Sequence, residues 1–286
     1  MKLRRFLYGA LLTLQAGLVL TGGAVRLTGS GLGCPTWPEC TPGSYTPVPH
    51  QAEGQLHAWI EFGNRLLTFA LVAVSIAVLA HVLNKGRRDL RTLALGQLLG
   101  ILGQGVLGGI TVLTDLHPLP VAGHLLLSII LIAGAVSLYS RREFVAVPRT
   151  DLERLTKRIS QMHIALTFVV IVLGTVVTGS GPHAGDEKAQ RFGFDIRTVA
   201  WLHADVVIAL LGLTAAFYIL VRSDKELLRR LTVFTVIALA QGAIGYIQYF
   251  TGIPEILVAA HLLGATLVWI AAWRIRITVT KTLAVE

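Results

Sequence analysis

Histidines recur at matching places in two halves of the chain, where they could bind a metal or a cofactor. Residues 104–108 are followed by His124-Leu-Leu, and residues 241–245 are followed by His261-Leu-Leu, with an offset of 137 residues at both ends. A proline-containing break precedes each histidine. A repeat that returns a histidine to the same place in an apolar segment indicates two related sites built by one duplicated unit.

A further histidine, His203, lies in an apolar segment at the same expected depth as His261. A polar residue in a membrane helix is costly and is a functional candidate, although a lone histidine could instead bond a neighbouring helix. Two imidazoles from facing helices can hold a haem iron from both sides. Zinc usually takes four ligands with thiolates or carboxylates among them, and no such cluster occurs at this depth. His203 and His261 therefore predict a bis-histidine haem site.

The first half departs from this pattern at one position. His124 matches His261, but Asn64 stands where His203 predicts a second ligand. Because asparagine is a poor iron ligand, either the iron has an open or labile second position or another residue replaces it. His57 is a candidate, since it lies seven residues before Asn64 on the same helical face. An incomplete ligand set gives oxygen or a substrate access to the iron, so we expect chemistry in the first half and electron transfer in the second.

Two charged residues close to Asn64 could take part in this chemistry. Glu61 and Arg65 are four residues apart, so they share a helical face and could simply pair with one another. A carboxylate at an open iron site could also accept or relay protons. Arg65 could bind the haem propionates near the outer surface, together with Arg26 after the first apolar segment.

Other polar residues have simpler interpretations. Cys34 and Cys40 are the only cysteines, and their loop faces an oxidising compartment, so they predict a disulfide. A redox-active role for the pair is the alternative. His163 is interpreted as a packing residue, whereas His183 lies in an outer loop, where functional residues often occur.

Membrane-spanning helices must position these residues. Hydrophobic residues make up 53% of the 286-residue chain and charged residues only 14%, far below the quarter typical of soluble domains. Apolar runs of about twenty residues, long enough to cross the hydrocarbon of a bilayer, recur along the chain. The sequence predicts eight spans, at roughly 6–25, 57–81, 93–113, 119–139, 160–180, 198–221, 231–250 and 255–275.

The net charge of +9 is better explained by membrane topology than by binding to nucleic acid. Most of the 25 lysines and arginines fall on one face, which the positive-inside rule makes cytoplasmic. Both termini are therefore expected in the cytoplasm, with anionic membrane lipid as the counter-charge. The basic, apolar N-terminus could be a cleaved signal peptide. However, residues 12–31 have a counterpart at 162–181, so we expect this segment to be retained as part of the fold.

The basic loop 141–158 divides the chain into halves 1–140 and 159–286, each with four spans. Because four is even, both halves have the same orientation, and a pseudo-two-fold axis along the membrane normal should relate them. The predicted fold is an all-α integral membrane protein of two tandem four-helix bundles. The candidate residues of the even-numbered spans lie about 6–12 Å below their outer loops, at about 1.5 Å per residue. Both sites are thus expected toward the extracytoplasmic face of the cell membrane.

Several stretches together resemble the haem A synthase family. They are the run 22–32 (GGAVRLTGSGL), the run 61–65, the His-Leu-Leu motifs at 124 and 261, and the cysteine pair in the first outer loop. The resemblance covers nearly all of the chain, including eight spans in two four-helix halves. It implies an enzyme that oxidises the C8 methyl group of haem O to the formyl group of haem A. Two successive hydroxylations would give a gem-diol, which loses water.

The resemblance also implies roles for individual residues. His203 and His261 would hold a resident haem b, whereas the first half would take haem O as substrate, with His124 as ligand and Glu61 as the catalytic carboxylate. Asn64 departs from the family's more usual histidine in the pattern Glu-x-x-His-Arg, so bis-histidine ligation of the substrate haem does not follow from the resemblance. Electrons would come from a membrane quinol, and a haem O synthase would supply the substrate.

Two other functions fit part of the pattern. A plain two-haem cytochrome b would pass electrons without turning over a substrate, and it predicts the same ligation in both halves. Asn64 counts against it. A transporter whose histidines relay protons would bind no haem. Such transporters often have helix pairs broken by proline or glycine in mid-membrane, and the sequence shows no such pair.

Overall fold

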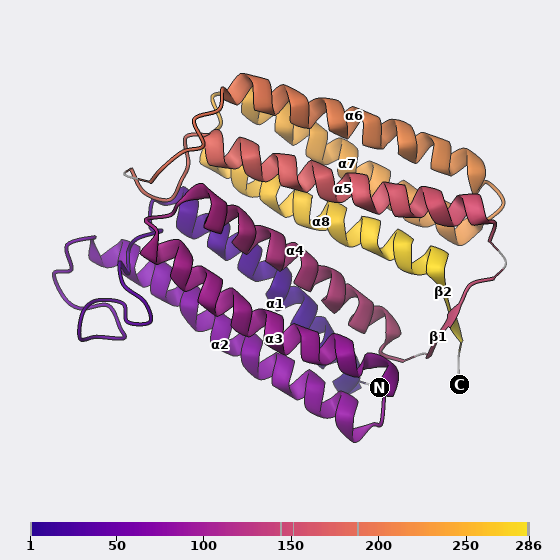
Figure 1. The fold of residues 1–286 in the computed structure, drawn as a ribbon, viewed down its shortest axis with the longest axis horizontal. Helices are drawn as coiled ribbons and strands as arrows, with labels where there is room; N and C mark the ends of the chain where they lie inside the picture. Colours follow the sequence, from indigo (N-terminus) through magenta and orange to yellow (C-terminus); the bar gives the residue numbers. More distant parts are fainter. Residues whose placement is uncertain (1, 144, 151, 188, 285–286) are drawn as a thin grey trace.

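Residues 2–143, 145–150, 152–187 and 189–284 are described in the computed structural model. Most of them form eight helices, each long and apolar enough to cross a membrane. In chain order these are α1 (Lys2–Leu27), α2 (Gln55–Asn84), α3 (Arg88–Leu113), α4 (Pro118–Arg141), α5 (Arg154–Ser180), α6 (Ile196–Leu220), α7 (Lys225–Phe250) and α8 (Glu255–Thr280). All eight predicted spans are therefore present, and the protein is a multi-pass helical membrane protein (Figure 1).

Several helices extend beyond the predicted apolar spans. α7 begins at Lys225, whereas its apolar run begins near residue 231. Asp224 caps this earlier start, because its carboxylate accepts hydrogen bonds from the backbone N–H groups of Glu226 and Leu227. Hydropathy marks only the part of a helix that lies in hydrocarbon, whereas backbone hydrogen bonding continues into the polar layer.

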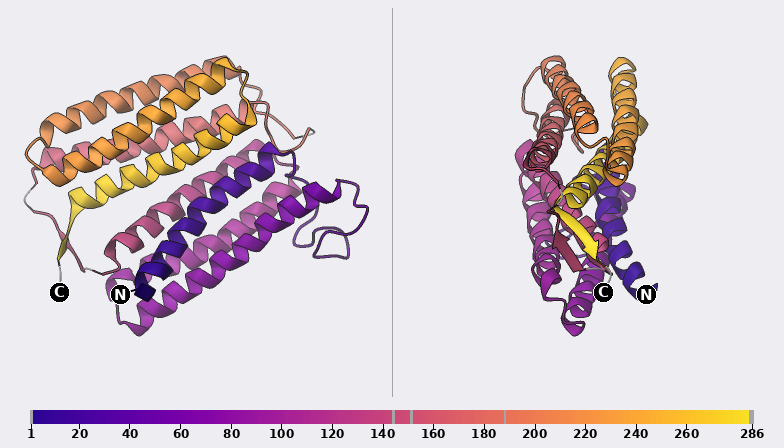
Figure 2. Two further views of the ribbon diagram at one scale, coloured as in Figure 1. Left: turned by 180° about the vertical axis from the view of Figure 1, so that it is seen from behind. Right: turned by 90° about the vertical axis from the view of Figure 1, so that its right-hand side faces the viewer.

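The helices form two groups of four that lie side by side, α1–α4 and α5–α8 (Figure 1). In the first group α1 packs on α2 and α4, and α3 packs on the same two helices, so the group is closed. In the second group α5 packs on α6 and α8, while α6 and α7 contact one another little and diverge (Figure 2). Each group has its own core, around Tyr8 and Leu90 in the first and around Phe217 and Phe234 in the second.

α8 joins the two groups, because it packs on α1 and α4 as well as on α5 and α7. Trp269 Nε1 donates a hydrogen bond to the carbonyl oxygen of Ile129 at 2.7 Å. One turn further along α8, Trp273 Nε1 donates to Ser137 Oγ at 2.8 Å. The halves are therefore joined by specific hydrogen bonds inside the apolar layer.

Two short strands add a feature that the sequence analysis did not predict. β1 (Val145–Pro148), in the linker after α4, pairs antiparallel with β2 (Lys281–Ala284), directly after α8. α4 and α8 end at the same end of the molecule, where the start of α1 also lies (Figure 2). Because α4 and α8 end near each other, the segments that follow them can pair, and no local sequence pattern predicts this pairing. That this end faces the cytoplasm stays a prediction.

The loop between α1 and α2 closes the other end of the first group. It contains a disulfide between Cys34 and Cys40, which confirms the predicted pairing, and both cysteines are fully buried. Trp37, between them, packs on Gly109 of α3, where a methyl group would lie 2.5 Å from the indole ring. The disulfide loop, residues 34–40, therefore covers the ends of α2 and α3.

Candidate functional site

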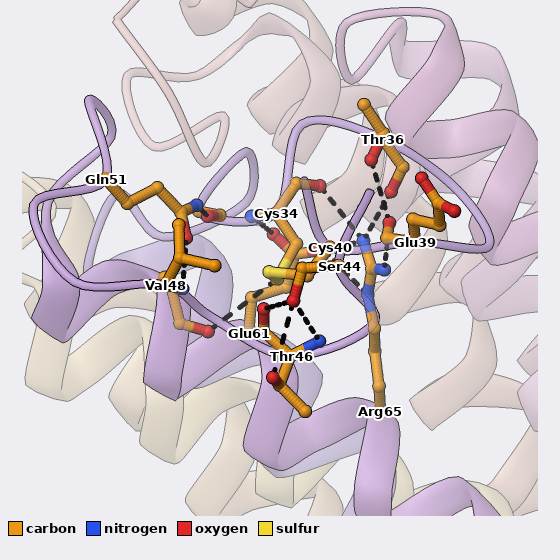
Figure 3. The surroundings of a disulfide bond; sticks show 12 residues. Cys34, Thr36, Glu39, Cys40, Ser44, Thr46, Val48, Gln51, Glu61 and Arg65 are labelled. Carbon is orange, nitrogen blue, oxygen red and sulfur yellow. Dashed lines mark hydrogen bonds and ion pairs between the residues drawn. A yellow bond between two sulfur atoms is a disulfide. The ribbon is translucent and has the colours of Figure 1, made fainter. Parts of the chain in front are cut away.

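Glu61 and Arg65 lie under the disulfide loop, toward the N-terminal end of α2 (Figure 3). Arg65 Nη2 donates to Glu61 Oε1 at 2.6 Å, and the backbone N–H of Cys34 donates to Glu61 Oε2 at 2.7 Å. Only 6% of Glu61 is exposed. The ion pair expected from the four-residue spacing is therefore present, and the loop adds a second partner that the spacing does not reveal.

Arg65 binds the disulfide loop as well as the carboxylate. Its guanidinium donates to the carbonyl oxygens of Cys34 at 3.0 Å, Thr36 at 3.1 Å and Glu39 at 3.2 Å. A guanidinium can serve so many acceptors because its five N–H groups form a rigid, planar fork. The charge of Glu61 is thus balanced inside the protein, and both of its oxygens are held in place. The predicted contact of Arg65 with haem propionates stays a prediction.

Asn64, on the turn of α2 after Glu61, is bound to α1. Its side-chain oxygen accepts a hydrogen bond from Thr21 Oγ1 at 2.6 Å. Thr21 was not among the residues that the sequence analysis selected. A threonine in an apolar helix commonly bonds its own backbone, so the sequence contains no signal for this contact.

His124 is held by its own neighbours on α3 and α4. Gln104 Nε2 donates to the carbonyl oxygen of His124 at 3.0 Å and to Ser128 Oγ at 2.6 Å. The imidazole lies beside Gly108, where a methyl group would be 3.4 Å from Cε1 of the ring. The duplicated segments 104–108 and 124–126 are therefore in contact, which explains why they recur together.

The second half repeats this arrangement around His261. Gln241 Nε2 donates to the carbonyl oxygen of His261 at 2.7 Å, and a methyl group on Gly245 would lie 3.0 Å from Cε1 of its ring. His203, on α6, lies beside Gly174 of α5 in the same way, at 3.5 Å. The imidazoles of His203 and His261 lie near enough for their charges to interact. The structure therefore brings together the two histidines that the sequence analysis paired.

α6 has a defined start that sets the depth of His203. Asp195 Oδ2 accepts hydrogen bonds from the backbone N–H of Thr198 at 2.8 Å and from its hydroxyl at 2.7 Å. These hydrogen bonds hold the pKa of the Asp195 carboxyl below its usual value. Because the cap fixes where the helix begins, it also fixes His203 about two turns deeper.

The three candidate ligands differ from the other buried or loop histidines in their bonding. The Nδ1 atoms of His124, His203 and His261 are buried and have no hydrogen-bond partner among the described residues. By contrast, His163 is hydrogen-bonded to Thr214 Oγ1 at 3.2 Å and packs between aromatic rings. His183 Nε2 donates to the carbonyl oxygen of Ile253 at 2.8 Å. A buried polar atom without a partner is costly, so these ring nitrogens make the three histidines candidates for binding a further group.

The neighbours of His57 and Arg26 in the structure are not the residues of the predicted haem sites. His57 lines a surface cavity of about 270 Å³, together with Glu53 and Asp186. Arg26 Nη2 donates to the carbonyl oxygen of Thr178 at 2.8 Å and so joins α1 to the end of α5. The roles of His57 as a substitute ligand and of Arg26 at the haem propionates stay predictions.

Comparison with known proteins matches this arrangement to one family. The family model COX15-CtaA, described as "Cytochrome oxidase assembly protein", matches residues 4–185, more than half of the chain. The matched region contains α1–α5 with Glu61, Asn64 and His124. It ends before His203 and His261.

Relatives named "Heme A synthase" support the same assignment. The protein of Geobacillus thermodenitrificans is 34% identical over 103 residues, 35% of this chain and 30% of the relative. That of Shewanella oneidensis is 30% identical over 176 residues, 57% of this chain and 51% of the relative. That of Methylobacterium radiotolerans is 34% identical over 218 residues, 64% of this chain and 57% of the relative.

The matches cover only part of each of these proteins. The chain spans between 30% and 57% of the length of the relatives named above. The family match covers residues 4–185, which include nearly all of the first group of helices and the disulfide loop. On this match, supported by the named relatives, the chain belongs to the COX15-CtaA family of cytochrome oxidase assembly proteins, the family of the haem A synthases.

Proposed function

We propose that this protein is a haem A synthase, which oxidises the C8 methyl group of haem O to a formyl group. The observation that carries the proposal is the difference between the outer ends of α2 and α6. α2 carries Glu61, Asn64 and Arg65, whereas α6 carries His203 between two alanines at the matching positions of the repeat. A carboxylate beside an incomplete ligand set suits reaction on a bound substrate, and a pair of histidines suits electron transfer.

In this proposal the second half holds a resident haem b through His203 and His261. The proposal is supported by the buried Nδ1 atoms of these two imidazoles, which lack a hydrogen-bond partner among the residues that the structure describes. Haem iron, when bound, supplies the one-electron and oxygen chemistry that amino-acid side chains lack. A quinol dissolved in the membrane is the proposed electron donor, and a haem O synthase is the proposed source of substrate.

The first half takes haem O as its substrate in this proposal. His124 is the proposed protein ligand, and the Glu61 carboxylate accepts and returns protons while the methyl carbon is oxidised. Two hydroxylations, each using one O2 and two electrons from the proposed quinol donor and releasing one water, would convert the methyl group to a gem-diol. Loss of water from the gem-diol leaves the formyl group. Glu61 suits this role because Arg65 and the Cys34 N–H hold its oxygens in place under the disulfide loop.

The proposal is tested by purifying the protein in detergent, recording its visible spectrum and identifying the extracted haems by chromatography. Haem b with traces of haem O or haem A is the expected result. A colourless protein would overturn both this proposal and the alternative of a two-haem cytochrome b. Two spectroscopically equivalent haems b, with no conversion of added haem O, would select the cytochrome instead.

Replacing the proposed haem b ligand provides a sharper test. His261→Ala is expected to abolish the haem b spectrum, because one of two protein ligands is lost. His163→Gln is the matched control, since His163 is also a buried membrane histidine but is already bonded to Thr214. The control is expected to keep the spectrum. Equal spectra of the two variants would exclude His261 as a ligand.

A further inference from the structure

Thr21 and Asn64 make a contact that the second half of the chain cannot make. Thr21 Oγ1 donates to Asn64 Oδ1 at 2.6 Å and joins α1 to α2. The matching positions of the repeat are occupied by Ile171 and His203, and an isoleucine side chain cannot donate a hydrogen bond. The two differences between the halves therefore occur together in the sequence: Thr21 and Asn64 in the first half correspond to Ile171 and His203 in the second.

The hydrogen bond from Thr21 determines which end of the Asn64 amide is free. An asparagine side chain has one oxygen that accepts and one nitrogen that can donate twice. The Thr21 hydroxyl has two acceptors within reach, Asn64 Oδ1 at 2.6 Å and the carbonyl oxygen of Leu18 at 3.4 Å, and the much shorter contact takes its single proton. Because Oδ1 accepts that proton, the donor nitrogen of Asn64 is the end left for another partner. Nδ2 of Asn64 faces Gly22 of α1, which has no side chain: a Cβ added to Gly22 would lie 3.9 Å from Nδ2. Apart from α1 itself, no other heavy atom lies within 4 Å of that added Cβ, so there is free space beside Gly22.

This free donor lies in the half that has only one candidate histidine ligand. Asn64 is one turn of α2 beyond Glu61, and both lie at the level where His203 stands in the second half. A neutral amide nitrogen carries its protons and has no lone pair to give to iron, so this end of Asn64 cannot replace a histidine. It can donate to an electron-rich atom that occupies the position a histidine would otherwise fill.

We propose that Thr21 is a positioning residue that makes Asn64 a hydrogen-bond donor to a small ligand on the first-half haem iron. The inference rests on the proposed function, because it needs a haem in that half. His124 is then the single protein ligand of that iron. The other axial position is open to a small electron-rich molecule, which the Asn64 amide stabilises.

Fluoride is a suitable probe, because it binds ferric haem iron at an open position and accepts hydrogen bonds. The full-length protein is loaded with haem O and kept ferric without reductant, so the substrate is not turned over. The second-half iron has two protein ligands in the proposed function, so fluoride reports only on the first half. Imidazole is titrated in parallel, since it also needs an open position but cannot accept a hydrogen bond at its bound nitrogen.

The variants distinguish the effect of the hydrogen bond on fluoride affinity from the effect of side-chain size. A hydrogen bond to a charged partner contributes enough for Asn64→Leu to weaken fluoride binding roughly 10- to 100-fold. Thr21→Val keeps the shape but loses the hydroxyl, so it is expected to weaken fluoride binding in the same direction by a smaller factor. Thr21→Ser restores the hydroxyl and is expected to bind fluoride as the wild type does. Imidazole binding should change much less in all three variants.

Asn64→His tests the same position by introducing a possible protein ligand there. A histidine there can occupy the axial position, so fluoride binding should be lost and the haem should become low-spin, as in the second half. The second-half haem spectrum reports in each variant that the protein is folded. This variant gives a result even if Thr21→Val proves too unstable to purify.

Two results would overturn the inference. One is a wild-type protein whose first-half haem is already low-spin with two protein ligands. The other is a fluoride affinity that stays unchanged in Asn64→Leu while haem O is bound. Failure of the proposed function is distinguishable from both, because the protein would then retain no haem O or would convert none after reduction in the presence of oxygen.

Discussion

Glu61 shows how a single buried carboxylate can be held in a fixed position in a membrane helix. An isolated buried carboxylate would be very costly, but both oxygens of Glu61 have partners, Arg65 on one and the Cys34 N–H on the other. The carboxylate is therefore fixed in position and covered by the disulfide loop (Figure 3). This arrangement differs from a surface ion pair, which would contribute little to stability or to orientation.

Glu61→Gln is expected to stop conversion of haem O to haem A while leaving haem b in place. Glutamine keeps the shape of the side chain but cannot accept a proton, and loss of a general base typically lowers a rate by about 100- to 10,000-fold. The rate is measured by chromatography of the haems extracted at intervals after reduction. Glu53→Gln, which changes another acidic residue close to the start of α2, is the control and should convert normally. A normal rate in Glu61→Gln would show that Glu61 is not the proton acceptor.

At the scale of single helices, glycines determine how closely the candidate ligands approach their neighbours. His124, His203 and His261 each lie beside a glycine of an adjacent helix, with a methyl group there predicted 3.0–3.5 Å from the ring. These glycines allow the helices to pack closely around the imidazoles. The positions of the rings therefore depend on α3, α5 and α7 as much as on the helices that carry the histidines.

Gly245→Ala is expected to displace the His261 ring and disturb the haem b spectrum. The added methyl group would lie 3.0 Å from Cε1 of the ring, and such overpacking typically costs about 1–3 kcal/mol. The measurements are the visible spectrum and the thermal stability of the purified protein. Gly212→Ala is the matched control, because Gly212 is exposed on α6 and has no neighbour within 4 Å of the new methyl group. Identical spectra for Gly245→Ala and wild type would contradict the role of this glycine.

At the scale of the whole molecule, α8 makes the two halves one structure. It carries His261 of the second half and also packs on α1 and α4 of the first. Two tryptophans of α8 donate hydrogen bonds to α4, and Arg26 joins α1 to the end of α5. The two halves are therefore joined by helix packing and by hydrogen bonds, which suits the electron transfer between them that we propose.

Trp269→Phe is expected to weaken the contact between the halves without removing the haem b ligands. It deletes the hydrogen bond to the carbonyl oxygen of Ile129, which leaves a buried acceptor without its partner and costs about 1–3 kcal/mol. A lower melting temperature with an unchanged haem b spectrum is the expected result. Trp59→Phe is the control, because Trp59 is 49% exposed and should tolerate the change. Equal melting temperatures for the two variants would mean that this hydrogen bond does not stabilise the assembly of the halves.

Much of the fold and part of the site could be predicted from local patterns. Eight apolar runs predicted eight helices, because a chain in hydrocarbon must satisfy its backbone hydrogen bonds within each segment. The duplicated segments predicted that His124 and His261 occupy equivalent places, and the structure gives both the same glutamine and glycine neighbours. The helix ends were predicted less well, because capping by residues such as Asp224 acts beyond the apolar run.

The sequence by itself therefore determined the class of protein, the number of helices and the family, since these follow from hydropathy, period and motif. Tertiary structure alone decided the partners of Glu61 and Asn64. Cys34 is 27 residues from Glu61, and Thr21 is 43 residues from Asn64. Such contacts depend on how α1, α2 and the disulfide loop pack in three dimensions, whereas helix formation depends on hydrogen bonds only four residues apart. In the sequence the two halves therefore differ at separate positions, whereas the structure shows that two of these residues, Thr21 and Asn64, form a hydrogen-bonded pair.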